Sequence, residues 1–347
     1  MKRIIFLICF ISLLAVSAFS QADLQPAATV NLIRTEPITV RQLRSEVERM
    51  ETSYGRTLTQ DERRQILDLM INERLALQAA ERDRVMVSEN EINQQMQQFR
   101  ASMAQQIGRQ PTDAEFAQAV RAQRGLDVQA FRDETRRQMV VQKYLMTKKG
   151  DLINSIRAPT EEEITAEFNL LRGQLVRPET VRLSMIEVPY GPDAASRERA
   201  RQLADRLIRE IGSNPSKFDE VVSRSAAPNS GYQAGELGYL PRNPEARAAV
   251  GQEFMNVAFG LRQGEVSRLI EGGQGFQILK VTENYSVANL GLDDIFQLGT
   301  RVTVREYIGQ LLLSQKQQTI IAQASQELVT ELRAGRSFQI FENNLNW

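Results

Sequence analysis

Few side chains of this chain can carry out acid–base or nucleophilic chemistry. Its 347 residues include no histidine, and the only cysteine, Cys9, lies in an apolar run near the start. Ser–His and Cys–His nucleophile pairs are therefore excluded, as are zinc sites built on histidine or cysteine. Carboxylates, lysines, tyrosines and hydroxyls remain, and most carboxylates stand at predicted helix starts or on solvated faces. We expect no cofactor and no metal ion.

One polar residue stands out within an apolar segment. Residues 272–281 read Gly-Gly-Gln-Gly-Phe-Gln-Ile-Leu-Lys-Val, which predicts a glycine-rich turn followed by a short strand. Since side chains alternate along a strand, Gln277 shares a face with Leu279 and Val281. An amide among apolar side chains needs a hydrogen-bond partner. Two interpretations stay open: Gln277 bonds a neighbouring strand, or it serves a binding site.

The charge balance excludes one class of partner. Lysine plus arginine and aspartate plus glutamate both number 43, so the formal net charge is zero. A dominant electrostatic attraction to nucleic acid or anionic lipid is therefore not expected. Hydrophobic residues make up 42% and charged residues 25%, which is ordinary for a soluble globular protein.

The start of the chain predicts export. Two basic residues precede the apolar run 4–16, and small residues follow it. This pattern is typical of a secretory signal peptide, here over residues 1–21, and the run is short for a membrane span. We expect cleavage near Ser20 or Ala22, a periplasmic location, and no integral membrane span after cleavage.

The first half of the chain is predicted to form a series of helices, which would position any site. The pattern Ser/Thr-x-x-Glu, which can cap two backbone N–H groups at a helix start, recurs at the heads of periodic apolar runs. These capping boxes begin at Thr59, Ser88, Thr112, Thr160 and Thr303. The predicted helices cover about 59–84, 88–107, 112–123, 127–156, 160–172 and 304–333.

Residues 178–284 have a different character. A strand over 179–189, helices over about 194–211 and from Phe218, a glycine-rich loop over 231–238, a helix over 251–260 and the strand that contains Gln277 follow in order. This order predicts a compact α+β domain. The predicted division is a signal peptide at 1–21, a helical domain at 22–177, an α+β domain at 178–284, and a linker with a C-terminal helix and strand at 285–347.

Four short motifs follow one another in the α+β segment: Phe218-Asp-Glu-Val-Val, Gly235-Glu-Leu-Gly238, Phe254-Met-Asn-Val-Ala-Phe259 and Gly275-Phe-Gln-Ile-Leu-Lys-Val281. In this order they resemble the signature of the parvulin-type (PpiC/rotamase) prolyl isomerases. The resemblance implies an apolar pocket for a prolyl ring. Its peptide-binding residues would be Leu237, Leu240, Val250, Phe254 and Phe259.

The same resemblance implies that the polar site of the family is replaced. Parvulins place one histidine on the last strand, where this chain has Gln277, and one on the first strand, where it has Met185. They place a cysteine or an aspartate in the loop after the Phe218 helix, where the matching residue is Ala227. We therefore assign no catalytic residue and expect a domain degenerate in catalysis.

The helical segment is similar to the N-terminal module of SurA-type periplasmic chaperones, through Ala28-Thr-Val-Asn31, Glu36-Pro-Ile-Thr39 and the helix segment 67–78. The resemblance implies that residues 303–341 fold back and complete a helical chaperone core, with the parvulin-like domain inserted, in an α+β fold class overall. It also implies unfolded envelope or outer-membrane polypeptides as partners. Met96, Phe99 and Met103, in a glutamine-rich helix, are candidates for an exposed client-binding strip.

Three functions fit these features. The first is an ATP-independent periplasmic chaperone whose parvulin-like domain has little activity. The second is an active prolyl isomerase that has rebuilt its site from residues such as Gln277, Ser184 and Tyr239. The third is a structural partner that docks one envelope protein.

Overall fold

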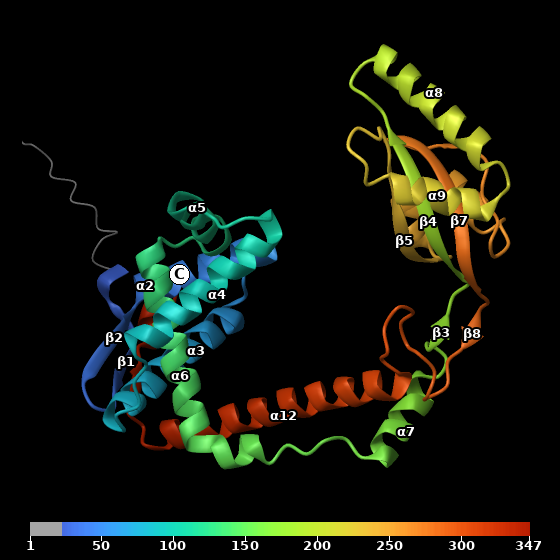
Figure 1. Cartoon of the computed structure of the whole chain (residues 1–347). Helices are drawn as coiled ribbons and strands as arrows, with labels where there is room; N and C mark the ends of the chain where they lie inside the picture. Colours follow the sequence, from blue (N-terminus) through green and yellow to red (C-terminus); the bar gives the residue numbers. More distant parts are fainter. Residues whose placement is uncertain (1–22) are drawn as a thin grey trace, which may run out of the picture. The chain divides into compact units, whose positions relative to one another are not determined.

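The chain folds into two compact units. A computed structural model describes residues 23–347, and the signal peptide expected over 1–21 lies outside them. The first unit contains the residues up to Ile156 together with Lys316–Trp347, and the second is Arg157–Gln315. Helix α12 (Val304–Ala334) contributes to both units (Figure 1). Between residues 23 and 347, no helix combines the length and the apolar character that crossing a membrane requires.

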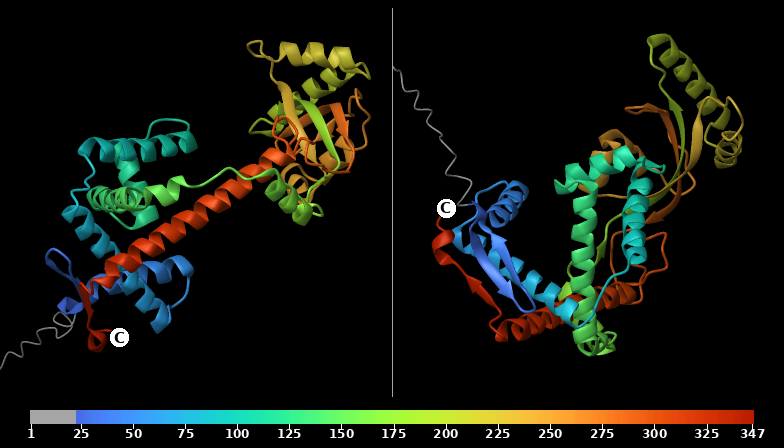
Figure 2. Two further views of the ribbon diagram at one scale, coloured as in Figure 1. Left: turned by 90° about the horizontal axis from the view of Figure 1, so that it is seen from below. Right: turned by 90° about the vertical axis from the view of Figure 1, so that its left-hand side faces the viewer.

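The first unit is mainly helical and contains one small antiparallel sheet. The strand order is β2-β1-β9, so the C-terminal strand lies beside the first strand of the described chain (Figure 2). The elements of this unit, besides the second part of α12, are β1 (Pro26–Asn31), β2 (Thr35–Thr39), α2 (Val40–Tyr54), α3 (Gln60–Arg82), α4 (Glu89–Ile107), α5 (Asp113–Arg124), α6 (Val128–Asn154), β9 (Phe338–Ile340) and the short 3-10 helix η1 (Glu342–Asn344).

Helix α3 forms the centre of this unit. Its apolar stripe, formed by Leu67, Ile71 and Leu75 at helical spacing, is completely buried. Gln78, one turn further along, is also completely buried. Its Oε1 atom accepts hydrogen bonds from two backbone N–H groups of the turn between β1 and β2. The distances to the nitrogen atoms of Leu32 and Ile33 are 3.0 and 3.1 Å. A buried amide on α3 thus fixes the β1–β2 hairpin.

The predicted helix starts are confirmed. At Thr59, Ser88, Thr112 and Thr160 the hydroxyl accepts a backbone N–H and the glutamate three residues later accepts another. Thr303 and its partner glutamate make the same two bonds at the start of α12. Five local sequence patterns therefore determine five helix boundaries in the structure.

Three of these capping glutamates have strongly lowered pKa values. The pKa of Glu62, Glu91 and Glu115 falls from the ordinary value of 4.5 to about 2. In each case the largest cause is a hydrogen bond from an arginine or lysine side chain, such as Arg56 at Glu62, and the capped N–H of the Ser or Thr follows. Both contacts stabilise the ionised carboxylate.

The second unit contains a four-stranded antiparallel sheet of order β5-β4-β7-β6, with helices on both faces. Helix α8 lies beside the strands β4 and β7 (Figure 1), and α9 lies beside α8 and β5. The elements, besides the first part of α12, are α7 (Glu161–Leu171), β3 (Val176–Arg177), β4 (Thr180–Pro189), α8 (Ala194–Ile211), α9 (Pro215–Arg224), β5 (Gln233–Pro241), α10 (Pro244–Val250), α11 (Gln252–Ala258), β6 (Ile270–Glu271), β7 (Gly275–Tyr285) and β8 (Ala288–Asn289).

The structure differs from the sequence prediction around residues 231–238. We expected a glycine-rich loop, but most of this segment belongs to edge strand β5, which pairs with β4 along its whole length. Leu183 lies opposite Gly238 and the next residue of β4 lies opposite Glu236, so Leu237 is the extra residue of a bulge. Gly238 has a φ of 93° there, a conformation that glycine adopts readily. Helix α10 was also not predicted.

Candidate functional site

The two faces of the four-stranded sheet carry separate apolar clusters. Ile186 and Ile278 pack on the side of α8 and α9, which we call the α9 face. Leu183 and Leu279 pack on the side of α10 and α11, which we call the α11 face. Because side chains alternate along β7, Gln277 lies on the α11 face, as the sequence predicted.

The Gln277 amide has a partner on the neighbouring strand. The strand register places Gln277 directly opposite Glu187, and Gln277 Nε2 donates a hydrogen bond to Glu187 Oε1 over 3.0 Å. Gly272 closes over the same amide, since a Cβ atom at Gly272 would lie 2.9 Å from Gln277 Oε1. Both polar side chains are half-buried. The amide therefore makes the bond to a neighbouring strand that was one of the two interpretations.

The other two positions matched to the parvulin site lie in different surroundings. Met185 is opposite Leu279 and packs with the α11-face cluster, two residues from Glu187 on β4. Ala227 is exposed in the loop between α9 and β5, where its N–H donates to the carbonyl oxygen of Arg224 over 3.1 Å. The two strand positions thus share one face. Together the three positions offer one amide, one thioether and one methyl group.

Four of the five expected peptide-binding residues meet in the α11-face cluster. Leu240 and Phe254 are only 8% and 4% exposed, and Val250 and Phe259 are partly buried against them. Leu237, in the β5 bulge, is 45% exposed. Leu240 and Phe254 therefore belong mainly to the core. Of the five residues, Leu237, Val250 and Phe259 keep exposed apolar area that a ligand could reach.

The expectation of a site rebuilt from Gln277, Ser184 and Tyr239 is wrong. Ser184 precedes Met185 on β4 and therefore lies on the opposite face, the α9 face. Tyr239 pairs with Arg182, whose guanidinium carbon lies 5.3 Å from the centre of the tyrosine ring, and Arg182 shares the face of Ser184. Both hydroxyls are separated from Gln277 by the sheet.

Glu187 is the candidate that the sequence analysis missed. Within residues 23–347, the Glu187 carboxylate accepts a hydrogen bond from Gln277 and forms no ion pair. A signal was present, since Glu187 continues the alternation of Leu183 and Met185 on an otherwise apolar face. The carboxylate gives this face a negative charge beside the positions that parvulins use.

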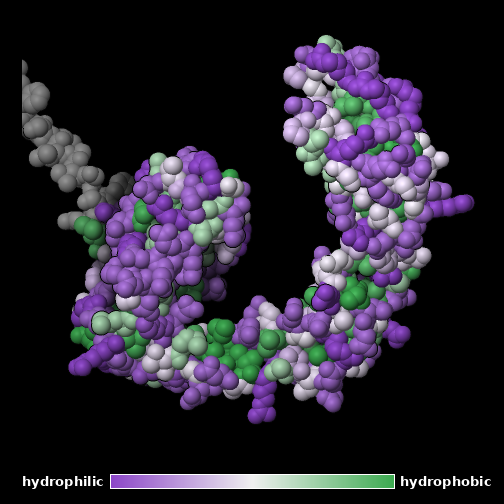
Figure 3. Space-filling model, viewed as in Figure 1, coloured by the Kyte–Doolittle hydropathy of each residue, from purple (hydrophilic) through white to green (hydrophobic). Residues whose placement is uncertain are grey.

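Met96, Phe99 and Met103 do not form the exposed strip that we expected. Met96 is 8% exposed, and Phe99 and Met103 are partly buried in the same cluster of α4, α5 and α6. The Phe99 ring lies edge-on to Phe131, with centres 5.0 Å apart. Over α4 and α5, the face seen in Figure 3 is predominantly hydrophilic. Client binding through these residues would need the cluster to open, and stays a prediction.

Two family models match the sequence. The model of the SurA-like N-terminal domain matches residues 1–145, and the model of the PPIC-type PPIase domain matches residues 184–283. The chain combines a SurA-like N-terminal domain with a PPIC-type PPIase domain. The residues matched to the PPIC-type domain include most of the sheet described above, with Met185, Glu187 and Gln277.

Two curated relatives are similar to this chain at low sequence identity. Chaperone SurA of Alcanivorax borkumensis is 26% identical over 279 residues, which cover 79% of this chain and 58% of the relative. Chaperone SurA of Pseudomonas aeruginosa is 26% identical over 234 residues, covering 67% and 52%. The chain spans a little over half the length of these curated relatives.

Solved structures align over most of this chain. One of two structurally related SurA-like chaperones of Campylobacter jejuni aligns at 15% identity over 87% of this chain and 97% of its own, with a TM-score of 0.31. PrsA from Bacillus subtilis aligns at 18% identity over 86% and 88%, with a TM-score of 0.25.

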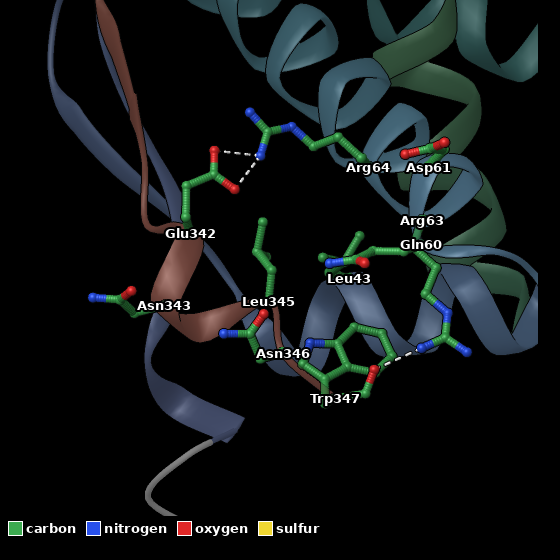
Figure 4. Close-up of a pocket in the computed structure, with 10 residues that line it drawn as sticks. All are labelled: Leu43, Gln60, Asp61, Arg63, Arg64, Glu342, Asn343, Leu345, Asn346 and Trp347. Carbon is green, nitrogen blue, oxygen red and sulfur yellow. Dashed lines mark hydrogen bonds and ion pairs between the residues drawn. The ribbon is translucent and has the colours of Figure 1, made fainter.

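The C-terminal tail packs on helices of the SurA-like domain. It borders a hollow of about 650 Å³ next to α2 and α3 (Figure 4). The guanidinium carbons of Arg44 and Arg63 lie 4.7 and 5.1 Å from the centre of the Trp347 ring, and Arg63 donates a hydrogen bond to the Trp347 carbonyl oxygen over 2.6 Å. Arg64 of α3 pairs with Glu342. These contacts hold the tail in the first unit.

Proposed function

We propose that this protein is an ATP-independent periplasmic chaperone that binds unfolded polypeptides of the envelope and outer membrane. The SurA-like N-terminal domain supports this function, because the relatives that share it are chaperones by name. The predicted signal peptide supports the periplasmic location. The sequence contains no phosphate-binding loop of the Walker type, which agrees with a function that does not use ATP.

We further propose that the PPIC-type domain holds proline-containing segments but accelerates their isomerisation little. The observation that carries this proposal is the Gln277–Glu187 hydrogen bond on a face where Met185 fills the other strand position. Rotation about a peptide bond has a barrier of about 18–20 kcal/mol. An enzyme lowers it only by binding the twisted amide better than the planar forms. A methionine and an amide already bonded to a neighbour are poorly equipped for this task.

Binding without catalysis is physically reasonable for this surface. Leu237, Val250 and Phe259 can cover a prolyl ring, and burial of apolar area contributes about 25 cal/mol per Å². This contribution does not depend on whether the peptide bond is planar or twisted. It therefore lowers the free energy of the ground state and the transition state alike, which strengthens binding without raising the rate.

The chaperone proposal is tested by light scattering. An outer-membrane protein is diluted from urea in the presence of stoichiometric mature protein, without ATP. We expect suppressed aggregation, and suppression of several unrelated clients. Unchanged scattering for all clients would contradict the proposal. Tight binding to one folded envelope protein, with no effect on unfolded ones, would favour the docking function instead.

A working isomerase is the second candidate, and one observation favours it. Glu187 Oε2 and the second N–H of the Gln277 amide have no other partner within the described residues, so the pair could still contact a substrate. If this pair supports catalysis, then Glu187→Gln should reduce isomerisation of a proline peptide without reducing client binding.

A further inference from the structure

A hollow lies at the surface of the PPIC-type domain, where β5 leads into α10 and α11. We call it the α10–α11 hollow, and its volume is about 360 Å³. Two arginines and three side-chain amides line it, and no carboxylate does. The lining residues are Arg242, Asn243, Pro244, Arg247, Gln252, Met255 and Asn256.

The two arginines differ in their surroundings. Arg242 forms an ion pair with Glu179 over 3.1 Å, and its guanidinium carbon lies 4.5 Å from the centre of the Phe259 ring. Arg247 is exposed and forms no ion pair within residues 23–347. Because Glu179 balances the charge of Arg242, the α10–α11 hollow keeps one uncompensated positive charge, at Arg247.

Two of the three amides around the hollow, Asn243 and Asn256, leave N–H donors for a ligand, whereas Gln252 leaves its side-chain oxygen. Asn243 Oδ1 accepts the N–H of residue 246 over 2.8 Å, and Asn256 Oδ1 accepts a hydrogen bond from Gln252 Nε2 over 2.8 Å. The Nδ2 group of Asn256 donates no hydrogen bond to any residue of the described chain. A positive charge together with free N–H donors favours an anionic ligand with oxygen acceptors.

The hollow adjoins the apolar surface that we propose for proline-containing segments. Met255 lines the hollow and belongs to the α11-face cluster with Phe254. Arg242 covers one side of Phe259. A peptide that places an apolar residue against this surface therefore has neighbouring residues within reach of the hollow.

We propose that the α10–α11 hollow binds the carboxylate of an aspartate or glutamate side chain of a client polypeptide, next to the residue that contacts the apolar surface. Arg247 supplies the charge and Asn256 a hydrogen bond. This inference rests on the proposed function, since it presumes that the domain binds unfolded polypeptides. It deepens that function by assigning a preference for acidic residues near proline.

The test compares two fluorescent proline peptides that differ only in one residue, glutamate or the isosteric glutamine, by anisotropy with the full mature chain. At low salt we expect the glutamate peptide to bind about two- to fivefold more tightly, in line with an exposed charge pair. Arg247→Gln should remove this preference. The matched control is Arg206→Gln, which removes the same charge from an exposed position of α8 in the same unit and should leave the preference intact.

A second variant protects the test against a general loss of binding. Asn256→Asp places a negative charge beside the one uncompensated positive charge of the hollow and should remove the preference for the glutamate peptide, while the glutamine peptide still binds. Equal affinity for both peptides in the unaltered protein would overturn the inference, as would a preference that Arg247→Gln and Arg206→Gln reduce equally. If aggregation is suppressed but no preference appears, the hollow assignment alone fails. If neither peptide binds and aggregation is unchanged, the proposed function fails as well.

Discussion

Gln78 should be one of the most sensitive polar positions of the SurA-like domain. Its side chain is completely buried and accepts hydrogen bonds from the backbone N–H groups of Leu32 and Ile33. In Gln78→Leu the apolar side chain fills the same space but offers no acceptor. A buried donor without a partner costs about 1–3 kcal/mol. The turn is partly exposed and can recover some hydration, so we take the lower value for each donor and expect a loss of about 2 kcal/mol.

The single tryptophan makes this loss measurable. Trp347 lies in the first unit, packed against Arg44 and Arg63, so its fluorescence reports unfolding of that unit. With a urea m-value of about 2 kcal/mol per M, the midpoint should fall by about 1 M. The matched control is Gln97→Leu at an exposed position of α4, which should leave the midpoint nearly unchanged. Equal midpoints for Gln78→Leu and the unaltered protein would refute the reasoning.

Three further predictions concern pH, domain structure and export. Since the pKa values of Glu62, Glu91 and Glu115 lie near 2 in the folded state, their contribution to stability is present above about pH 4.5 and is lost as the pH falls towards 2. Replacing all three by glutamine keeps the cap acceptors and should flatten the fall in urea midpoint over this range; an unchanged slope would contradict the assignment. Joining the chain across a deletion of residues 178–284 should leave a helical protein that unfolds cooperatively by circular dichroism, whereas an unfolded product would argue against an inserted domain. Sequencing of the exported protein should find a start near residues 21–23, and an intact Met1 in the membrane fraction would disprove cleavage.

The sequence predicted the helical part of the fold well, because its signals are local. A Ser or Thr hydroxyl and a glutamate three residues later determine a helix start without any distant contact, as at Thr59 and Ser88. The apolar stripe of α3 follows from helical spacing alone, and its members Leu67 and Ile71 are buried. These features depend on residues within one or two helical turns.

Features that depend on pairing between distant segments were missed. Strand β5 contains Gly235 and Gly238, which have low strand propensity, and it forms because β4 supplies its hydrogen bonds. The contact of Gln277 with Glu187 joins residues 90 positions apart, on strands β4 and β7 that are paired in the sheet but not consecutive in the chain. Met96 is buried because α5 and α6 cover α4, which the glutamine-rich sequence of that helix did not indicate.

The central claim is that this protein binds clients while its PPIC-type domain contributes little catalysis. The most direct test measures, on one preparation, protease-coupled isomerisation of a proline peptide and light scattering of an aggregating outer-membrane protein. We predict an isomerisation rate close to the uncatalysed rate, unaffected by Gln277→Ala, together with clear suppression of aggregation. Robust isomerisation that disappears in Gln277→Ala would contradict the claim.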